Sequence, residues 1–150
     1  MSKVFIVFGE IENNLILSKV IEFWGAKELK LIILHQELPN HQCSEFLIKE
    51  HNPFIEEHQV ESLKEAFNYI ENANGIIICD TNPSGESMMK SSLIKGIPCI
   101  AVKSPLVEEL LPSEFHLNEL NTDKVLDFFI RNIAKFDLSS IREHLHFHYD

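Results

Sequence analysis

Short apolar runs alternate with longer amphipathic segments along most of the chain. Four of these runs have the length and composition of buried strands, because they are five or six residues long and mostly apolar on both faces. They are Val4–Phe8, Leu29–Leu34, Gly75–Cys79 and Ile97–Val102. A shorter strand is expected at Glu114–Leu117. The pattern therefore predicts a sheet that is covered on both sides.

The segments between the apolar runs have the spacing of amphipathic helices. The expected helices are Asn14–Trp24, Ser62–Asn72, Ser84–Lys95 and Thr122–Ala134. Ser62 and Glu65 have the spacing of a capping box, and Gly25 is a typical helix stop. Short helices are expected near Ser44–Glu50 and from a second capping box at Ser140–Glu143. The remainder of residues 36–59 is interpreted as irregular, and Pro105–Pro112 as a crossing segment.

The order of these elements predicts the fold class. Apolar strands separated by amphipathic helices are typical of a parallel sheet with helices on both faces. Right-handed crossovers then give a three-layer, doubly wound α/β domain, flavodoxin-like or Rossmann-like, with four or five mainly parallel strands. With 150 residues and 45% apolar content, residues 1–150 are expected to form a single domain.

The loops that follow the strands predict the ligand site. Ligands of such sheets bind beyond the carboxyl ends of the strands, where Gly9–Asn13, His35–Asn40 and Asp80–Glu86 are expected. The third loop enters a helix, whose free N–H groups and positive dipole end suit a phosphate or carboxylate. Ser84 is equally well explained as a helix cap, and Asp80 as part of a turn. The expected ligand-binding residues are Gly9, Glu10, His35, Asp80, Asn82, Ser84 and Gly85.

Charge and cysteine usage narrow the class of partner. A net charge of −10 argues against binding to nucleic acid through its phosphate backbone. No apolar run approaches the roughly 20 residues of a membrane-spanning helix, and no signal peptide opens the sequence. The odd set of Cys43, Cys79 and Cys99 contains no CxxC pair, so we expect a reduced, cytoplasmic protein.

The C-terminal region is rich in histidine and aromatic residues. His144, His146 and His148 have spacings that can bind a metal, but no nearby cysteine and no firm carboxylate completes a tetrahedral ligand set. We therefore expect neither a metal nor a cofactor. Some of the aromatic residues, which include Phe128 and Phe136, are expected to fill the core beneath the last helices, and any surplus could form the face of a homo-oligomer.

The first third of the sequence resembles a known family. Lys3–Gly9, Glu12-Asn13, Ile21–Gly25 and Leu31–Asn40 are similar to the opening of bacterial TIR-like predicted nucleotide-binding proteins. That family is structurally akin to the nucleoside 2-deoxyribosyltransferases. The resemblance implies action on an N-glycosidic bond, with a catalytic glutamate in the helix after a central strand.

The sequence departs from this family at two positions. Phe8 stands where the family commonly has histidine, and Met88 or Met89 stands at the aligned position of the glutamate. Glu86 is the nearby acid, so the resemblance implies that Glu86 is catalytic and stabilises the positive charge that develops on the ribose. Acids in the first helical turn also offset the dipole, which is the plainer explanation of Glu86.

Two functions follow from the resemblance. The first is an enzyme that binds a nucleotide or nucleoside and cleaves or exchanges its N-glycosidic bond. Such an enzyme would be an NAD glycohydrolase or would resemble a nucleoside deoxyribosyltransferase. The alternative is a non-catalytic, nucleotide-sensing or self-associating TIR-like module. In both, the partner is a small nucleotide or nucleoside.

Overall fold

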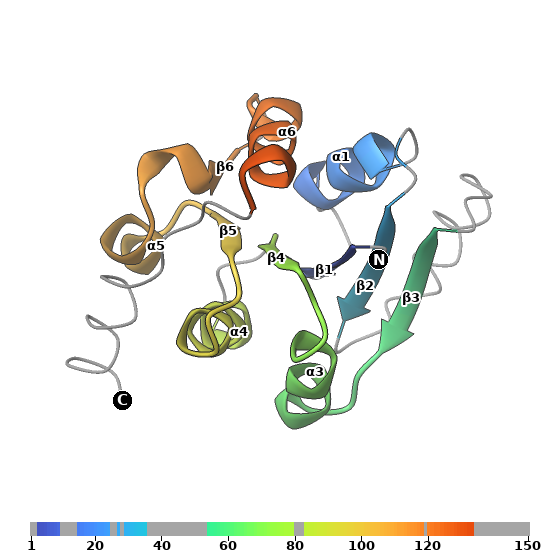
Figure 1. Cartoon of the computed structure of the whole chain (residues 1–150). Coiled ribbons are helices and arrows are strands. Elements are labelled where there is room, and N and C mark those ends of the chain that lie inside the picture. The colour runs from blue at the N-terminus through green and yellow to red at the C-terminus, as the bar shows by residue number, and fades with distance from the viewer. Residues whose placement is uncertain are drawn as a thin grey trace.

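A computed structural model describes residues 3–9, 15–24, 27, 29–35, 54–79, 83–118 and 120–133 (Figure 1). Its strands are β1 (Val4–Phe8), β2 (Lys30–His35), β3 (Ile55–Gln59), β4 (Gly75–Ile78), β5 (Cys99–Val102) and β6 (His116–Leu117). Its helices are α1 (Leu15–Trp24), α3 (Leu63–Ile70), α4 (Pro83–Ile94), α5 (Pro105–Leu110) and α6 (Thr122–Asn132), with a 3₁₀ turn at Ser113–Phe115. None of these described helices is long and apolar enough to cross a membrane.

The six strands form one sheet in the order β3-β2-β1-β4-β5-β6, and every strand pairing in the described ranges is parallel. This is the strand order of a Rossmann fold, in which the chain winds outward from the centre in both directions. The prediction of a doubly wound α/β fold is therefore confirmed. The order reverses between β1 and β4, which are direct neighbours.

The join between β1 and β4 links distant parts of the sequence. At its start, the Val4 N–H donates to Asn74 Oδ1 at 2.8 Å, and the Asn74 N–H donates to the Val4 carbonyl at 2.7 Å. From there the two strands pair in parallel register as far as Phe8, which lies opposite Ile78. The centre of the sheet therefore depends on contacts about 70 residues apart.

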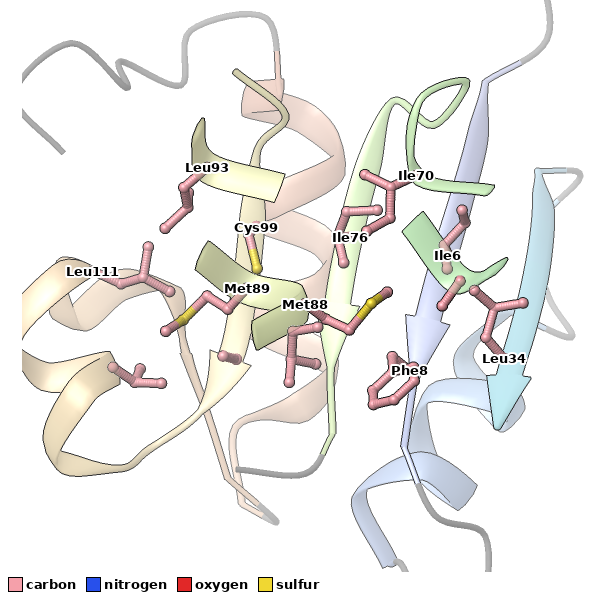
Figure 2. Close-up of a cluster of buried hydrophobic side chains, with 14 of the residues drawn as sticks. Ile6, Phe8, Leu34, Ile70, Ile76, Met88, Met89, Leu93, Cys99 and Leu111 are labelled. Atoms are coloured by element: carbon pink, nitrogen blue, oxygen red, sulfur yellow. The ribbon is translucent and has the colours of Figure 1, made fainter. Parts of the chain in front are cut away.

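Helices cover both faces of the sheet, as Figure 1 shows. α3, α4 and α5 pack on one face, against side chains that include Ile6, Phe8 and Ile76. Figure 2 shows Met88 and Met89 of α4 among these buried side chains. Burial of this continuous apolar layer on both faces is the main stabilising contribution to the fold.

α1 and α6 pack on the opposite face. Their buried residues meet the side chains of Phe5, Val7 and Ile77. Phe129 of α6 packs edge-on against Phe5, with ring centroids 6.1 Å apart. α6 lies so close to β4 that a Cβ added at Gly75 would be 2.9 Å from the Phe129 ring. A larger residue at position 75 would force the Phe129 ring and the end of the Ile133 side chain to shift.

The buried cysteines fill space in this core. Cys79 and Cys99 are both free thiols with almost no exposure. Burial raises the pKa of Cys99, so this thiol remains protonated and unreactive in the folded chain. Cys43 lies outside the described residues.

Two elements differ from the sequence-based expectation. β3 lies in a segment interpreted as irregular, because four of its five residues are polar. It pairs with β2 alone among the described strands and needs no continuous apolar run. The expected crossing segment is instead helix α5. The sheet has six strands rather than four or five, and the short helices expected at Ser44–Glu50 and Ser140–Glu143 lie outside the described residues.

The capping pattern at Ser62 behaves largely as expected. Ser62 Oγ accepts a hydrogen bond from the Glu65 N–H at 3.2 Å, and a Glu65 carboxylate oxygen accepts one from the Glu61 N–H at 3.0 Å. The Glu65 carboxylate thus accepts from the N–H of Glu61, whereas a standard capping box would use the N–H of the N-cap residue, Ser62.

Replacing Ser62 by alanine is expected to lower the free energy of unfolding by about 1 kcal/mol, because the first turn of α3 loses a hydrogen-bond acceptor. Urea unfolding followed by circular dichroism measures the change. Ser113→Ala is the control, since Ser113 is exposed and opens a 3₁₀ turn without a side-chain cap. Equal stability of Ser62→Ala and the native chain would contradict the capping role.

Candidate functional site

The carboxyl ends of β1 and β4 mark the point where the strand order reverses. Beyond them, the Gly9 N–H donates to the Leu34 carbonyl at 3.4 Å, and the Cys79 N–H donates to the Phe8 carbonyl at 2.9 Å. Gly9 is buried although it follows the last residue of β1. The chain therefore leaves both strands from a fixed position, and the crevice beyond them is where such sheets bind ligands.

Helix α4 begins at this edge with Pro83 in its first position. Proline fits there because its missing N–H would have no partner in the helix. Gly85, in the first turn, is buried, whereas Ser84 and Glu86 are half-buried. The start of α4 carries the positive end of the helix dipole, which favours an anion at this end.

Glu86 joins the start of α4 to the start of α5. Ser104 Oγ donates to a Glu86 carboxylate oxygen at 3.4 Å and accepts from the Val107 N–H at 3.2 Å, which caps α5. The neighbouring Lys103 forms an exposed ion pair with Glu108 at 3.1 Å. Glu86 thus has a positioning role at this edge. Its carboxylate can also accept hydrogen bonds from the hydroxyl groups of a ligand.

The structure places four of the predicted site residues on this edge. Gly9 lies after β1, and Ser84, Gly85 and Glu86 lie in the first turn of α4. His35 ends β2 and pairs with Gln59 of β3, which puts it one strand further from the crevice. The remaining predicted residues, Glu10, Asp80 and Asn82, lie outside the described residues.

Ser104 is a residue of this edge that the sequence analysis missed. The sequence Ser104-Pro105 does indicate the start of a helix, because serine is a common N-cap residue and proline is common in the first turn. The interpretation of Pro105–Pro112 as a crossing segment hid that signal. Among the described residues, no group of three or more histidine, cysteine, aspartate or glutamate side chains could hold a metal.

Met88 and Met89 do not belong to the site. Both have at most 1% of their surface exposed and pack in the core cluster of the α4 face (Figure 2). The position at which the TIR-like resemblance aligned a catalytic glutamate therefore points into the core. Phe8, which stands where that family commonly has histidine, belongs to the same cluster.

Comparisons with known proteins identify the fold. No family model matches the sequence, and no curated protein matches it. Solved structures do match. The catalytic domain of cholesterol-α-glucosyltransferase from Helicobacter pylori is 13% identical with a TM-score of 0.71, and the match covers 96% of this chain and 97% of that one.

Two further structures extend the comparison. The C-terminal domain of a group 1 family glycosyl transferase (LpcC) from Francisella tularensis is 10% identical with a TM-score of 0.72. That match covers 99% of this chain and 86% of the other. The S. aureus MnaA–UDP complex is 13% identical with a TM-score of 0.67, and the match covers 94% of this chain and 40% of MnaA. At these identities, the similarities establish a shared fold.

These findings overturn the resemblance drawn from the sequence. Among the similar structures are two glycosyltransferase domains and a protein solved with UDP, and they do not support a relation to TIR-like proteins or nucleoside 2-deoxyribosyltransferases. The expected cleavage or exchange of an N-glycosidic bond depended on that resemblance and is therefore wrong. The alternative of a non-catalytic TIR-like module is wrong for the same reason. Glu86 keeps its place at the carboxyl edge without the chemistry that the resemblance implied for it.

Proposed function

We propose that the chain is the donor-binding domain of a glycosyltransferase, which holds a nucleoside diphosphate sugar at the crevice between β1 and β4. The observation that supports it best is the similarity to glycosyltransferase domains over nearly the full length of both chains. The S. aureus enzyme solved with UDP adds a nucleotide ligand on a similar fold. Residues 1–150 then act as one domain, and the described strands all belong to one sheet.

The start of α4 suits the diphosphate of such a donor. The positive end of the α4 dipole lies at the carboxyl edge, where it favours a phosphate. When the sugar is transferred, the bond between the sugar carbon and the diphosphate oxygen breaks. The leaving diphosphate takes the electron pair, and fixed donors stabilise that charge.

The remaining polar groups suit the sugar hydroxyls of the donor. Glu86 already accepts a hydroxyl hydrogen bond from Ser104, so its carboxylate has the chemistry to accept one from a ribose or a hexose. Glu10, Asp80 and Asn82 are proposed as further contacts, because they follow β1 and β4 in the chain, and His35 is proposed as a contact from the end of the neighbouring strand β2.

Binding of nucleotides to the purified chain tests the proposal. We expect one of UDP, ADP, GDP and dTDP to raise the melting temperature, because a ligand that binds only the folded state stabilises it by mass action. Inorganic phosphate at equal concentration is the comparison for nonspecific anion binding. If no nucleotide exceeds the effect of phosphate, the chain does not bind a nucleotide donor.

Two matched variants test whether the phosphate groups of the nucleotide bind at the start of α4. Ser84→Glu puts a negative charge at the start of α4, and Ser91→Glu puts the same charge near the other end of the same helix. Ser84→Glu is expected to weaken nucleotide binding at least tenfold, since about 1.4 kcal/mol of repulsion is enough for that factor. Ser91→Glu should leave it unchanged. Equal effects of the two substitutions, measured by calorimetry, would exclude the start of α4 as the phosphate site.

A further inference from the structure

The surface between α1 and α6 contains a groove that the donor site does not use. It encloses about 630 Å³, on the face of the sheet opposite to α3, α4 and α5. We call it the α1–α6 groove. Its lining residues are Lys19, Glu22, Phe23, Lys27, Leu120, Thr122, Asp123 and Lys124.

An apolar side chain projects from one side of this groove. Leu120 is 98% exposed, although it lies in a turn that several hydrogen bonds fix. Asn118 Oδ1 accepts from the Leu120 N–H at 2.8 Å and from the Asn121 N–H at 3.0 Å, and Thr122 Oγ1 donates to the Asn118 carbonyl at 2.7 Å. A rigid turn that presents a leucine loses little conformational freedom when a partner covers it.

The charges of the groove are of both signs. Lys27 lies over the Phe23 ring at 5.0 Å, and within the described ranges neither Lys27 nor Lys124 pairs with a carboxylate. In contrast, Lys30, Lys95, Lys103 and Arg131 do form ion pairs, at 2.8–3.3 Å. Among the described residues, Lys64 on α3 also forms no ion pair, so an unpaired lysine does not by itself mark an interface.

Together these features make the surface complementary to itself. It carries a projecting leucine next to a hollow, and lysines next to the carboxylates of Glu22 and Asp123. An interface between identical subunits related by a two-fold axis requires such a patch, because the same residues must serve as both partners. An anionic ligand would meet the two carboxylates, and an apolar one would cover the lysines without pairing them.

We propose that the α1–α6 groove binds a second copy of this chain in a two-fold symmetric dimer. Leu120 of each copy enters the groove of the other beside Phe23. Lys27 and Lys124 of each copy face the carboxylates of the other, Glu22 and Asp123. The described lining of the groove includes none of the residues placed at the donor crevice, Gly9, Ser84, Gly85 and Glu86.

Complementary charge changes test the dimer sharply. In one variant, Lys27→Glu and Lys124→Glu make the groove acidic, and in a second variant, Glu22→Lys and Asp123→Lys make it basic. Sedimentation equilibrium is expected to show a dimer for the native chain and at least tenfold weaker self-association for each variant. An equimolar mixture of the two variants should associate again, because each supplies the charges that the other has lost.

Two further variants complete the experiment. Leu120→Asp should weaken the dimer at least tenfold, and Lys64→Glu, on the opposite face of the sheet, should leave it unchanged. Thermal melting shows whether each variant is folded before its association is measured. A native chain that stays monomeric over the whole concentration range overturns the proposal, and so does a mixture of the two charge variants that fails to associate.

Discussion

Replacing Phe129 by alanine is expected to lower the free energy of unfolding by about 3–5 kcal/mol. The Phe129 side chain is fully buried on the α1 face of the sheet, where its ring packs edge-on against Phe5. It also fills the space above Gly75, where no Cβ intervenes. Alanine would leave a cavity between α6 and β4, and the rigid sheet cannot collapse to fill it. Urea unfolding of the purified variant measures the loss.

Phe128→Ala is the matched control for this prediction. Phe128 is the next residue of the same helix, but 36% of its surface is exposed, and its ring contacts Phe115 at a centroid distance of 5.8 Å. Its loss is expected to cost about 1 kcal/mol, in the range of one exposed aromatic pair. If the two variants were equally stable, α6 would not pack against β4 as described.

Replacing Met88 by glutamate is expected to unfold the chain or to cost at least about 4 kcal/mol. The Met88 side chain is fully buried among apolar residues of the α4 face, and no cation of that cluster is available to pair with a carboxylate. Because burial disfavours the charged form, the pKa of the new carboxyl would rise above its value in the unfolded chain. Stability should therefore fall further as the pH rises from below 4 to 7.

The outcome separates two views of this position. Met88→Leu keeps the volume and polarity, so it should cost less than about 1.5 kcal/mol. The TIR-like resemblance would instead make position 88 or 89 a place for a functional glutamate. A stable Met88→Glu variant, with unfolding that does not depend on pH in this range, would show that the helix presents this position to solvent.

The strands that the sequence predicts well are those buried on both faces. Val4–Phe8 and Gly75–Ile78 are apolar throughout, because neighbouring strands and two helical layers surround them. β3 could not be recognised in the same way. The Glu56 carboxylate lies 3.1 Å from the Lys30 ammonium group, and the His58 and Tyr69 ring centroids are 5.3 Å apart. These half-buried positions of β3 are therefore polar and do not form an apolar run. The pairing with β2 that makes it a strand is a tertiary contact.

The location of the candidate site could be predicted better than its chemistry. The start of α4 and the residues after β1 lie at the carboxyl edge, because parallel strands bring their ends to one side of a sheet. The residues behind the family resemblance, such as the strand Val4–Phe8 followed by Gly9, specify a strand and a tight exit that many α/β folds share. They therefore carry information on the fold and little on the reaction. The contact of Glu86 with Ser104 joins residues 18 apart and has no local signature.

The join between β1 and β4 sets an order of events during synthesis of the chain. β1 leaves the ribosome before β2 and β3, yet its central neighbour β4 is complete only at Ile78. At about 5–20 residues per second, the edge of β1 that later binds β4 waits for several seconds after β2 has emerged. An open apolar strand edge is a template for pairing with other chains. Slow translation of residues 36–78 is therefore expected to increase aggregation of the nascent chain, whereas slow translation after β4 should have little effect.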